Sequence, residues 1–208
     1  MLTPTLLEEK KLWQNGLINV AGLDEAGRGS WAGPVVAAIV ILPKTHIKIE
    51  SVRDSKLLND KQRRELYLEI IDNAADFGVG IISHRIIDQV GILEATELAG
   101  KEAFNMLKIK PDFLLVEALD LRSHIKCEQK AVIKGDQKIY SISCASIIAK
   151  VTRDNLMVNL GGEYKKYEFH LHKGYGTKRH QELLSEYGPC DLHRTSYKPI
   201  GRYYKLDS

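Results

Sequence analysis

The segment from Asn19 to Leu42 constrains the fold of this chain more than any other part of the sequence. An apolar run that begins at Leu17 ends abruptly in two adjacent carboxylates, Asp24 and Glu25. A glycine-arginine-glycine triplet follows at once, and a second apolar run begins at Val35. The pattern predicts two strands joined by a tight polar turn. Carboxylates at such a strand end can bind a metal ion, although acidic residues are also common as solvated side chains at a hairpin tip.

Hydrophobic periodicity predicts further helices and strands along the rest of the chain. The predicted helices cover residues 1–16, 59–75, 92–107, 141–160 and 178–187, and the predicted strands cover 77–83, 111–117 and 131–136. Asn59 is the expected N-cap of the second helix, because its side chain can accept a hydrogen bond from the first turn. A short turn is expected before residue 92, and an irregular chain after residue 187. This order predicts a mixed α/β sheet with helices packed on it and a small C-terminal appendage.

The bulk composition is that of a globular protein, since 44% of the 208 residues are hydrophobic and 27% are charged. The net charge of +3 does not by itself indicate a nucleic-acid partner. No apolar run reaches about 18 residues and no leader sequence opens the chain, so we expect neither a membrane span nor a signal peptide. The three cysteines are an odd number without a CxxC spacing, which argues against a disulfide framework and a cysteine zinc site, so we expect a cytoplasmic protein in a reducing compartment.

The C-terminal part of the chain combines basic groups with aromatic rings. Residues 163–205 contain seven tyrosines and four histidines, interleaved with Lys165, Lys166, Lys173, Lys178, Arg179, Arg194, Lys198, Arg202 and Lys205. Such a mixture is typical of surfaces that bind a phosphate backbone and stack on sugars or bases. A solvated basic tail explains the same composition equally well.

Four acidic residues are candidates for one cluster. Asp24 and Glu25 end the first predicted strand. Glu117 ends a strand whose continuous apolarity predicts burial on both faces, and Asp154 lies on the long predicted helix. Carboxylates gathered this closely would repel one another unless a divalent cation neutralised them, and oxygen ligands select Mg²⁺ or Mn²⁺ over zinc. Each acid taken singly is equally a surface carboxylate, and Asp154 is also a helix-face partner for Lys150.

A series of motifs carries a resemblance to a known family. The motifs are Gly22–Gly29, Ala32–Val36, Asp54–Leu58, Lys134–Asp136, Ala145–Asp154, His172–Thr177 and His193–Tyr197. In sequence, order and spacing this series closely resembles that of bacterial ribonuclease HII, in the type 2 ribonuclease H family. The resemblance covers the chain from about residue 17 to residue 200.

The resemblance implies an RNase H-like α/β fold, in which a mixed β-sheet is flanked by helices and followed by a small helical C-terminal extension. Residues 1–162, with a short helical lead-in, would form the catalytic domain, and residues 163–208 an extension of helix and loop that contacts substrate. The implied activity is metal-dependent endonucleolytic cleavage of the RNA strand of RNA–DNA hybrids. Single ribonucleotides embedded in duplex DNA would also be cut.

The resemblance also implies the products and the partners. The cut would fall 5′ to the ribonucleotide and leave 3′-hydroxyl and 5′-phosphate ends, as ribonucleotide excision repair and RNA primer removal require. The cofactor would be Mn²⁺ or Mg²⁺, with two ions about 4 Å apart during catalysis. We expect a monomer, and we find no clear clamp-binding peptide at the C-terminus.

Individual residues acquire roles from the same resemblance. Asp24 and Glu25 match the first two family acids, and Asp154 matches the last. The implied catalytic and metal-binding residues are therefore Asp24, Glu25, Glu117 and Asp154. The implied substrate-binding residues are Gly27, Arg28, Gly29, Lys56, Lys173 and Tyr175. The glycine-rich loop would contact the ribonucleotide 2′-hydroxyl through its backbone. Tyr175 would pack on the deoxyribose that follows, the alternative being simple loop packing.

Glu117 departs from the family pattern, which has Asp at this position. The extra methylene moves the carboxylate oxygens by about a bond length, and metal sites are sensitive to shifts on that scale. Either the site has adjusted, or the metal preference has shifted towards Mn²⁺, or activity is reduced. The alternative function is therefore a catalytically impaired protein that binds RNA–DNA hybrids. A third possibility, a resolvase or integrase of the same fold, is disfavoured by the glycine-rich loop and by the motif that contains Tyr175.

Overall fold

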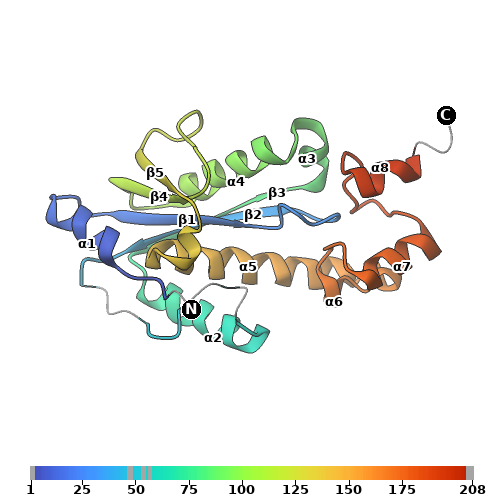
Figure 1. Cartoon of the computed structure of the whole chain (residues 1–208), viewed down its shortest axis with the longest axis horizontal. Coiled ribbons are helices and arrows are strands. Elements are labelled where there is room, and N and C mark those ends of the chain that lie inside the picture. Colours follow the sequence, from blue (N-terminus) through green and yellow to red (C-terminus); the bar gives the residue numbers. More distant parts are fainter. Residues whose placement is uncertain (1–2, 46–48, 53–54, 56–57, 205–208) are drawn as a thin grey trace.

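The computed structural model describes residues 3–45, 49–52, 55 and 58–204. At its centre lies a five-stranded sheet with the strand order β3-β2-β1-β4-β5 (Figure 1). The strands are Val20–Ala26 (β1), Val35–Leu42 (β2), Asp76–Ile82 (β3), Phe113–Glu117 (β4) and Glu128–Val132 (β5). β2 pairs antiparallel with both β1 and β3, whereas β4 pairs parallel with both β1 and β5. The predicted mixed sheet is confirmed.

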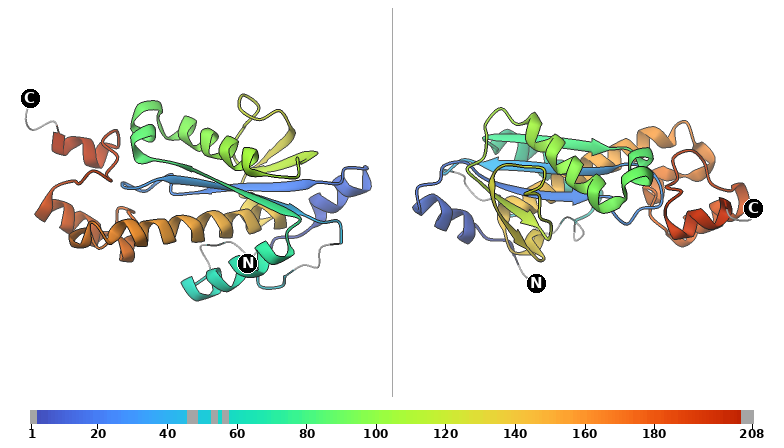
Figure 2. Two further views of the ribbon diagram at one scale, coloured as in Figure 1. Left: turned by 180° about the vertical axis from the view of Figure 1, so that it is seen from behind. Right: turned by 90° about the horizontal axis from the view of Figure 1, so that it is seen from above.

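Helices cover both faces of this sheet. They are Leu7–Gln14 (α1), Asp60–Asn73 (α2), His84–Val90 (α3), Ile92–Met106 (α4), Tyr140–Gly161 (α5), Phe169–His172 (α6), Lys178–Tyr187 (α7) and Lys198–Tyr204 (α8). The helices α3 and α4 lie on one face, and α5 lies on the other with α2 outside it (Figures 1 and 2). Within the described ranges, no helix combines the length and the apolarity needed to cross a membrane.

The alternation of side chains along β1 and β4 divides the core into two layers. Leu23 and Val116 pack in the cluster beneath α4, whereas Leu115 packs in the cluster beneath α5. Because successive strand residues point to opposite faces, both faces of these strands must be apolar. Gly22 points at α5, and a Cβ atom there would lie 2.2 Å from the backbone carbon of Ser141. The absence of a side chain at Gly22 therefore lets α5 lie directly on β1.

The expected N-cap of α2 is confirmed. The side chain of Asn59 accepts a hydrogen bond from the Gln62 backbone N–H at 2.9 Å, and the Gln62 side chain accepts one from the Asn59 N–H at 3.0 Å. This reciprocal capping box satisfies two backbone donors that have no partner within the helix.

Three local predictions were wrong. The last strand was expected over residues 131–136, but β5 ends at Val132, opposite Glu117, where β4 also ends. Lys134 then adopts a left-handed conformation, and Gly135–Gln137 form a 3-10 turn, η2. The expected short turn before α4 is the seven-residue helix α3, which the Ser83 side chain caps. The C-terminus, expected to be irregular, contains α8, whose buried Ile200 anchors it.

The C-terminal segment is joined to the turn that follows β1. Backbone hydrogen bonds link the Trp31 N–H to the Gly174 carbonyl and the Gly33 N–H to the Leu192 carbonyl, both at 2.8 Å. The segment lies beyond one end of the sheet, beside the β1–β2 turn (Figure 2). The polar turn and the basic C-terminal residues, distant in sequence, therefore form one surface.

Candidate active site

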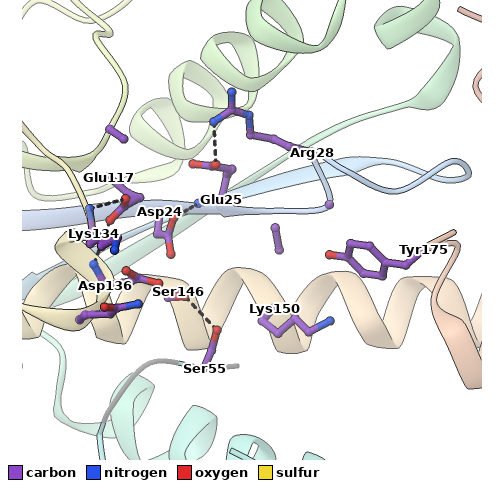
Figure 3. A pocket seen from close by; sticks show the side chains of 14 residues that line it. Asp24, Glu25, Arg28, Ser55, Glu117, Lys134, Asp136, Ser146, Lys150 and Tyr175 are labelled. Atoms are coloured by element: carbon purple, nitrogen blue, oxygen red, sulfur yellow. Dashed lines mark hydrogen bonds and ion pairs between the residues drawn. The ribbon is translucent and has the colours of Figure 1, made fainter. Parts of the chain in front are cut away.

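A cavity of about 650 Å³ opens where β1 and β4 end. The parallel register pairs Leu23 with Val116, so the next residues, Asp24 and Glu117, lie side by side. Both follow residues that face α4, so both side chains point to the face that α5 covers. The acids at these two strand ends are thereby brought to one wall of the cavity (Figure 3).

Asp24 is buried, with only 5% of its surface exposed. Its Oδ1 accepts a hydrogen bond from the Glu25 backbone N–H at 2.7 Å. Burial raises the pKa of Asp24 well above its ordinary value, and the charges of Glu25 and Glu117 raise it further. Hydrogen bonds from Ser146 and from the Glu25 N–H act in the opposite direction. A cation near Asp24 would remove the penalty that burial and its neighbours impose on the carboxylate.

Glu25 is the next residue of β1, so its side chain leaves the strand on the opposite face from that of Asp24. Its Oε1 lies 3.2 Å from Nη1 of Arg28, three residues further on. Both residues line the cavity, so this ion pair connects the acidic wall to the glycine-rich turn.

Glu117 is held by the turn after β5. Its Oε1 accepts from the Lys134 N–H at 3.0 Å, and its Oε2 accepts from the Asp136 N–H at 2.9 Å. Two hydrogen bonds from consecutive parts of one turn fix the carboxylate in a single orientation. The same turn brings the Asp136 side chain into the cavity, where it joins the three predicted acids (Figure 3).

Asp154 does not join them. It lines a separate, smaller depression with Arg63 and Lys173, and its Oδ1 accepts a hydrogen bond from Lys150 at 2.8 Å. Ser146, which contacts Asp24, lies eight residues earlier on α5, and eight residues span about 12 Å of helix. The expected convergence of Asp154 with the strand-end acids is therefore not found, and its predicted pairing with Lys150 is present. The fourth acid of the cavity is Asp136.

The glycine-rich turn and Tyr175 form the opposite wall. Gly27, with φ +97°, takes a left-handed conformation, and a Cβ atom there would lie 2.0 Å from Nε of Arg153. Arg28 lines the cavity beside it, and Gly29 is exposed. The Tyr175 ring lies across the cavity from the acids, with Lys150 Nζ 5.1 Å from its centre (Figure 3).

The two predicted substrate-binding lysines have different outcomes. Lys56 lies outside the described residues. Lys173 lines the depression that contains Asp154, and its ammonium group donates to the carbonyl of His170.

Sequence reasoning missed several residues of the cavity. Asp136 belongs to the motif Lys134–Asp136, but the sequence predicts a strand there and does not group its side chain with the other acids. Ser55 and Ser146 also line the cavity, and their hydroxyl oxygens lie 3.0 Å apart. The available signal was that each lies in a motif of the series, as does Lys150.

Outside the cavity, but within the described part of the chain, another group of side chains could bind a metal ion. One ligating atom each from Glu94, Glu97 and His124 lies within 4.8 Å of the other two. The two glutamates lie on α4, and His124 Nε2 lies 3.4 and 3.1 Å from their oxygens. Because α4 covers the face of the sheet opposite α5, this group is not part of the cavity (Figure 1).

Comparison with known proteins identifies relatives over most of the chain. The family model described as Ribonuclease HII matches residues 21–200. Ribonuclease HII of Caldicellulosiruptor bescii is 48% identical over 189 residues, which cover 91% of each chain. Ribonuclease HII of Dehalococcoides mccartyi is 47% identical over 202 residues, which cover 96% of this chain and 95% of that protein.

Solved structures give the same fold. The ribonuclease H2 of Pyrococcus horikoshii is 30% identical, with a TM-score of 0.79 over 91% of this chain and 98% of that one. The ribonuclease HII of Archaeoglobus fulgidus, solved in complex with PCNA, is 27% identical, with a TM-score of 0.74 over 87% and 96%. The ribonuclease HIII named Bst-RNase HIII, solved in complex with Mn²⁺, is 20% identical and supports the fold alone, with a TM-score of 0.76 over 98% and 74%. The predicted RNase H-like fold is confirmed.

Proposed function

Because the chain belongs to the ribonuclease HII family, and is therefore an endonucleolytic ribonuclease H acting on RNA–DNA hybrids, we propose that it also cuts DNA at single embedded ribonucleotides. The cut falls 5′ to the ribonucleotide and leaves 3′-hydroxyl and 5′-phosphate ends. These products serve ribonucleotide excision repair and RNA primer removal. The observation that carries the proposal is the set of four carboxylates lining one cavity opposite the glycine-rich turn.

The residues that would hold divalent cations are Asp24, Glu25, Glu117 and Asp136. The fit is chemical: every donor is an oxygen, which suits Mg²⁺ or Mn²⁺, and the raised pKa of Asp24 favours a neutralising cation. Ions bound there supply Lewis acidity and an activated water. Asp154 would not bind the ions itself; its carboxylate forms an ion pair that holds Lys150.

The chain's own residues supply orientation. The backbone of Gly27, Arg28 and Gly29 faces the ribonucleotide 2′-hydroxyl, and the Tyr175 ring packs on the following deoxyribose. Residues 1–162 then act as the catalytic domain, and residues 163–208 as a basic extension that binds the duplex. The protein acts as a cytoplasmic monomer.

The test is cleavage of a DNA duplex that contains one ribonucleotide, with Mg²⁺ and Mn²⁺ compared. We expect a single cut 5′ to the ribonucleotide and no cut in the all-deoxy duplex. Asp24→Asn, which keeps the size of the side chain, should lower cleavage by at least about 10³-fold, because several kcal/mol of metal-derived stabilisation are lost. Cleavage that ignores the ribonucleotide, or full activity of Asp24→Asn, would contradict the proposal.

One observation favours the second candidate, an impaired hybrid-binding protein. Both oxygens of Glu117 accept backbone hydrogen bonds from the turn at residues 134–136, which limits their freedom to approach an ion. This candidate predicts that the unaltered chain binds the duplex without cutting it, and that binding falls steeply with salt. Glu117→Asp would then restore cleavage. Activity of the unaltered chain eliminates this candidate.

A further inference from the structure

Two fully buried arginines lie beneath the turn from Arg28 to Pro34. Arg153 comes from α5 and Arg194 from the C-terminal segment, and neither exposes any surface. Within the described residues neither guanidinium forms an ion pair with a carboxylate. Their hydrogen bonds go instead to carbonyl and hydroxyl oxygens, most of them in this turn and the others on Lys173 and Tyr197. A buried charge costs several kcal/mol of desolvation, so hydrophobic side chains of similar volume would often be no less stable there.

Arg194 holds the turn at three carbonyls. Its Nε donates to the Gly33 carbonyl at 3.0 Å, and its two terminal nitrogens donate to those of Arg28 at 3.0 Å and Pro34 at 3.1 Å. Burial lowers the pKa of Arg194 to about 10, which leaves the group charged at neutral pH. The turn is therefore held by charge-assisted hydrogen bonds, which are about twice as strong as neutral ones.

Tyr197 completes the arrangement. Its hydroxyl accepts from Arg194 Nη1 at 2.9 Å and donates to the Arg28 carbonyl at 2.5 Å. The Arg194 guanidinium lies 5.1 Å from the centre of the Tyr197 ring. One carbonyl oxygen, that of Arg28, therefore receives hydrogen bonds from two side chains of the C-terminal segment.

Fixing this carbonyl also fixes the amide on the other side of the same peptide. The chain has no cis peptide within the described residues, so the Gly29 N–H points opposite to the Arg28 carbonyl. The Gly27 carbonyl is similarly fixed by the Ser30 N–H at 3.3 Å and the Ser30 hydroxyl at 2.9 Å, which turns the Arg28 N–H outward. Neither outward N–H has an acceptor among the described residues, and a Cβ atom at Gly29 would meet nothing within 4 Å.

We propose that Arg194 and Tyr197 are positioning residues for ribose recognition, which aim the Gly29 N–H at the 2′-oxygen by fixing the Arg28 carbonyl. The inference rests on the proposed function and extends it to the C-terminal segment. An amide already held in place pays no ordering entropy when the ribose arrives, so its hydrogen bond contributes more to binding. A deoxyribose lacks the oxygen and gains nothing from the fixed amide.

Tyr197→Phe is the discriminating variant, because it removes one hydroxyl and keeps the ring against Arg194. Tyr204→Phe is the matched control, since this tyrosine is 52% exposed in the same C-terminal segment. Affinities for two duplexes that differ only in one ribose or deoxyribose are measured in the Asp24→Asn background, so that neither is cut. A single hydrogen bond contributes about 0.5–1.5 kcal/mol, so we expect Tyr197→Phe to lower the ribose-to-deoxyribose affinity ratio by about 3- to 10-fold. The Tyr204→Phe ratio should not change.

A second readout does not depend on activity. The Gly29 amide resonance of the unliganded protein should shift in Tyr197→Phe and stay in place in Tyr204→Phe. The inference is overturned if Tyr197→Phe leaves the Gly29 resonance in place or leaves the ribose-to-deoxyribose affinity ratio unchanged. An equal loss of affinity for both duplexes would also overturn it, because such a loss indicates a purely structural role for Tyr197. If the Asp24→Asn protein does not discriminate between the two duplexes at all, the proposed function itself fails. The cleavage assay described above tests that function separately.

Discussion

At the residue scale, the position of each acid is decided by the element that carries it. Asp24 and Glu117 directly follow the last paired residues of the neighbouring parallel strands β1 and β4, and they point to the same face. Asp136 reaches them because the turn at residues 134–136 folds back on Glu117. Asp154 follows Lys150 by one helical turn and pairs with it. Two aspartates of the motif series thus have different surroundings, and their substitutions should have different effects.

Asp136→Asn and Asp154→Asn form a matched pair that tests this difference. We expect Asp136→Asn to lower kcat for hybrid cleavage by at least about 10²-fold, because a cavity carboxylate is lost. Asp154→Asn should lower it by less than about 10-fold, because only the contact to Lys150 changes. The measurement is the steady-state kcat of each variant on the same RNA–DNA hybrid, compared with that of the unaltered chain. A larger loss in Asp154→Asn would return that residue to the place that the family resemblance gave it.

At the scale of elements, the closeness of α5 to β1 decides where the cavity forms. Ser146 contacts Asp24, and Lys150 lies near Tyr175, only because the helix rests directly on the strand. The contact depends on Gly22, where the helix backbone takes the place of a side chain. A substitution at Gly22 should therefore disturb both the packing of α5 on β1 and the shape of the cavity.

Gly22→Ala should destabilise the fold. Its Cβ atom would lie 2.2 Å from the backbone carbon of Ser141, so strand and helix must separate. We expect a loss of about 3 kcal/mol, which lowers the thermal unfolding midpoint by about 10 °C for a chain of this size. Gly29→Ala, where nothing lies within 4 Å, is the control and should change the midpoint by less than about 2 °C. Equal midpoints for the two variants would contradict the close approach.

At the scale of the whole molecule, a chain of neutral histidines joins the C-terminal segment to the Tyr175 loop. His193 Nδ1 accepts from the Cys190 N–H at 2.9 Å, so its proton is on Nε2, which lies 3.0 Å from His180 Nε2. His180 Nδ1 then donates to the Tyr175 carbonyl at 3.0 Å. Burial lowers the pKa of His180 to about 3 and that of His193 to about 4.

Stability should therefore fall as the pH drops below about 6.5. In that range the unfolded chain takes up protons on both histidines while the folded chain does not, so the free energy of unfolding decreases. Between pH 7 and pH 5 we expect a loss on the order of 2 kcal/mol for each histidine. Urea unfolding at both pH values measures the loss, and His180→Gln should reduce it. His170→Gln, at an exposed position, should leave it unchanged, and a pH-independent free energy in the unaltered chain would contradict the assignment.

The sequence by itself determined the mixed sheet, the N-cap of α2 and the family, because these depend on local periodicity and on contiguous motifs. It also placed Glu117 at the end of a buried strand, since continuous apolar runs mark buried strands, whereas β1 continues two residues past Asp24 to Ala26. Only the tertiary structure decided which acids meet. Asp136 enters the cavity through a left-handed residue at Lys134 and a backbone hydrogen bond to Glu117, and neither follows from hydropathy. Likewise, the hold of Arg194 and Tyr197 on Arg28 joins residues more than 160 positions apart, through hydrogen bonds that exist only once the C-terminal segment has packed against the turn.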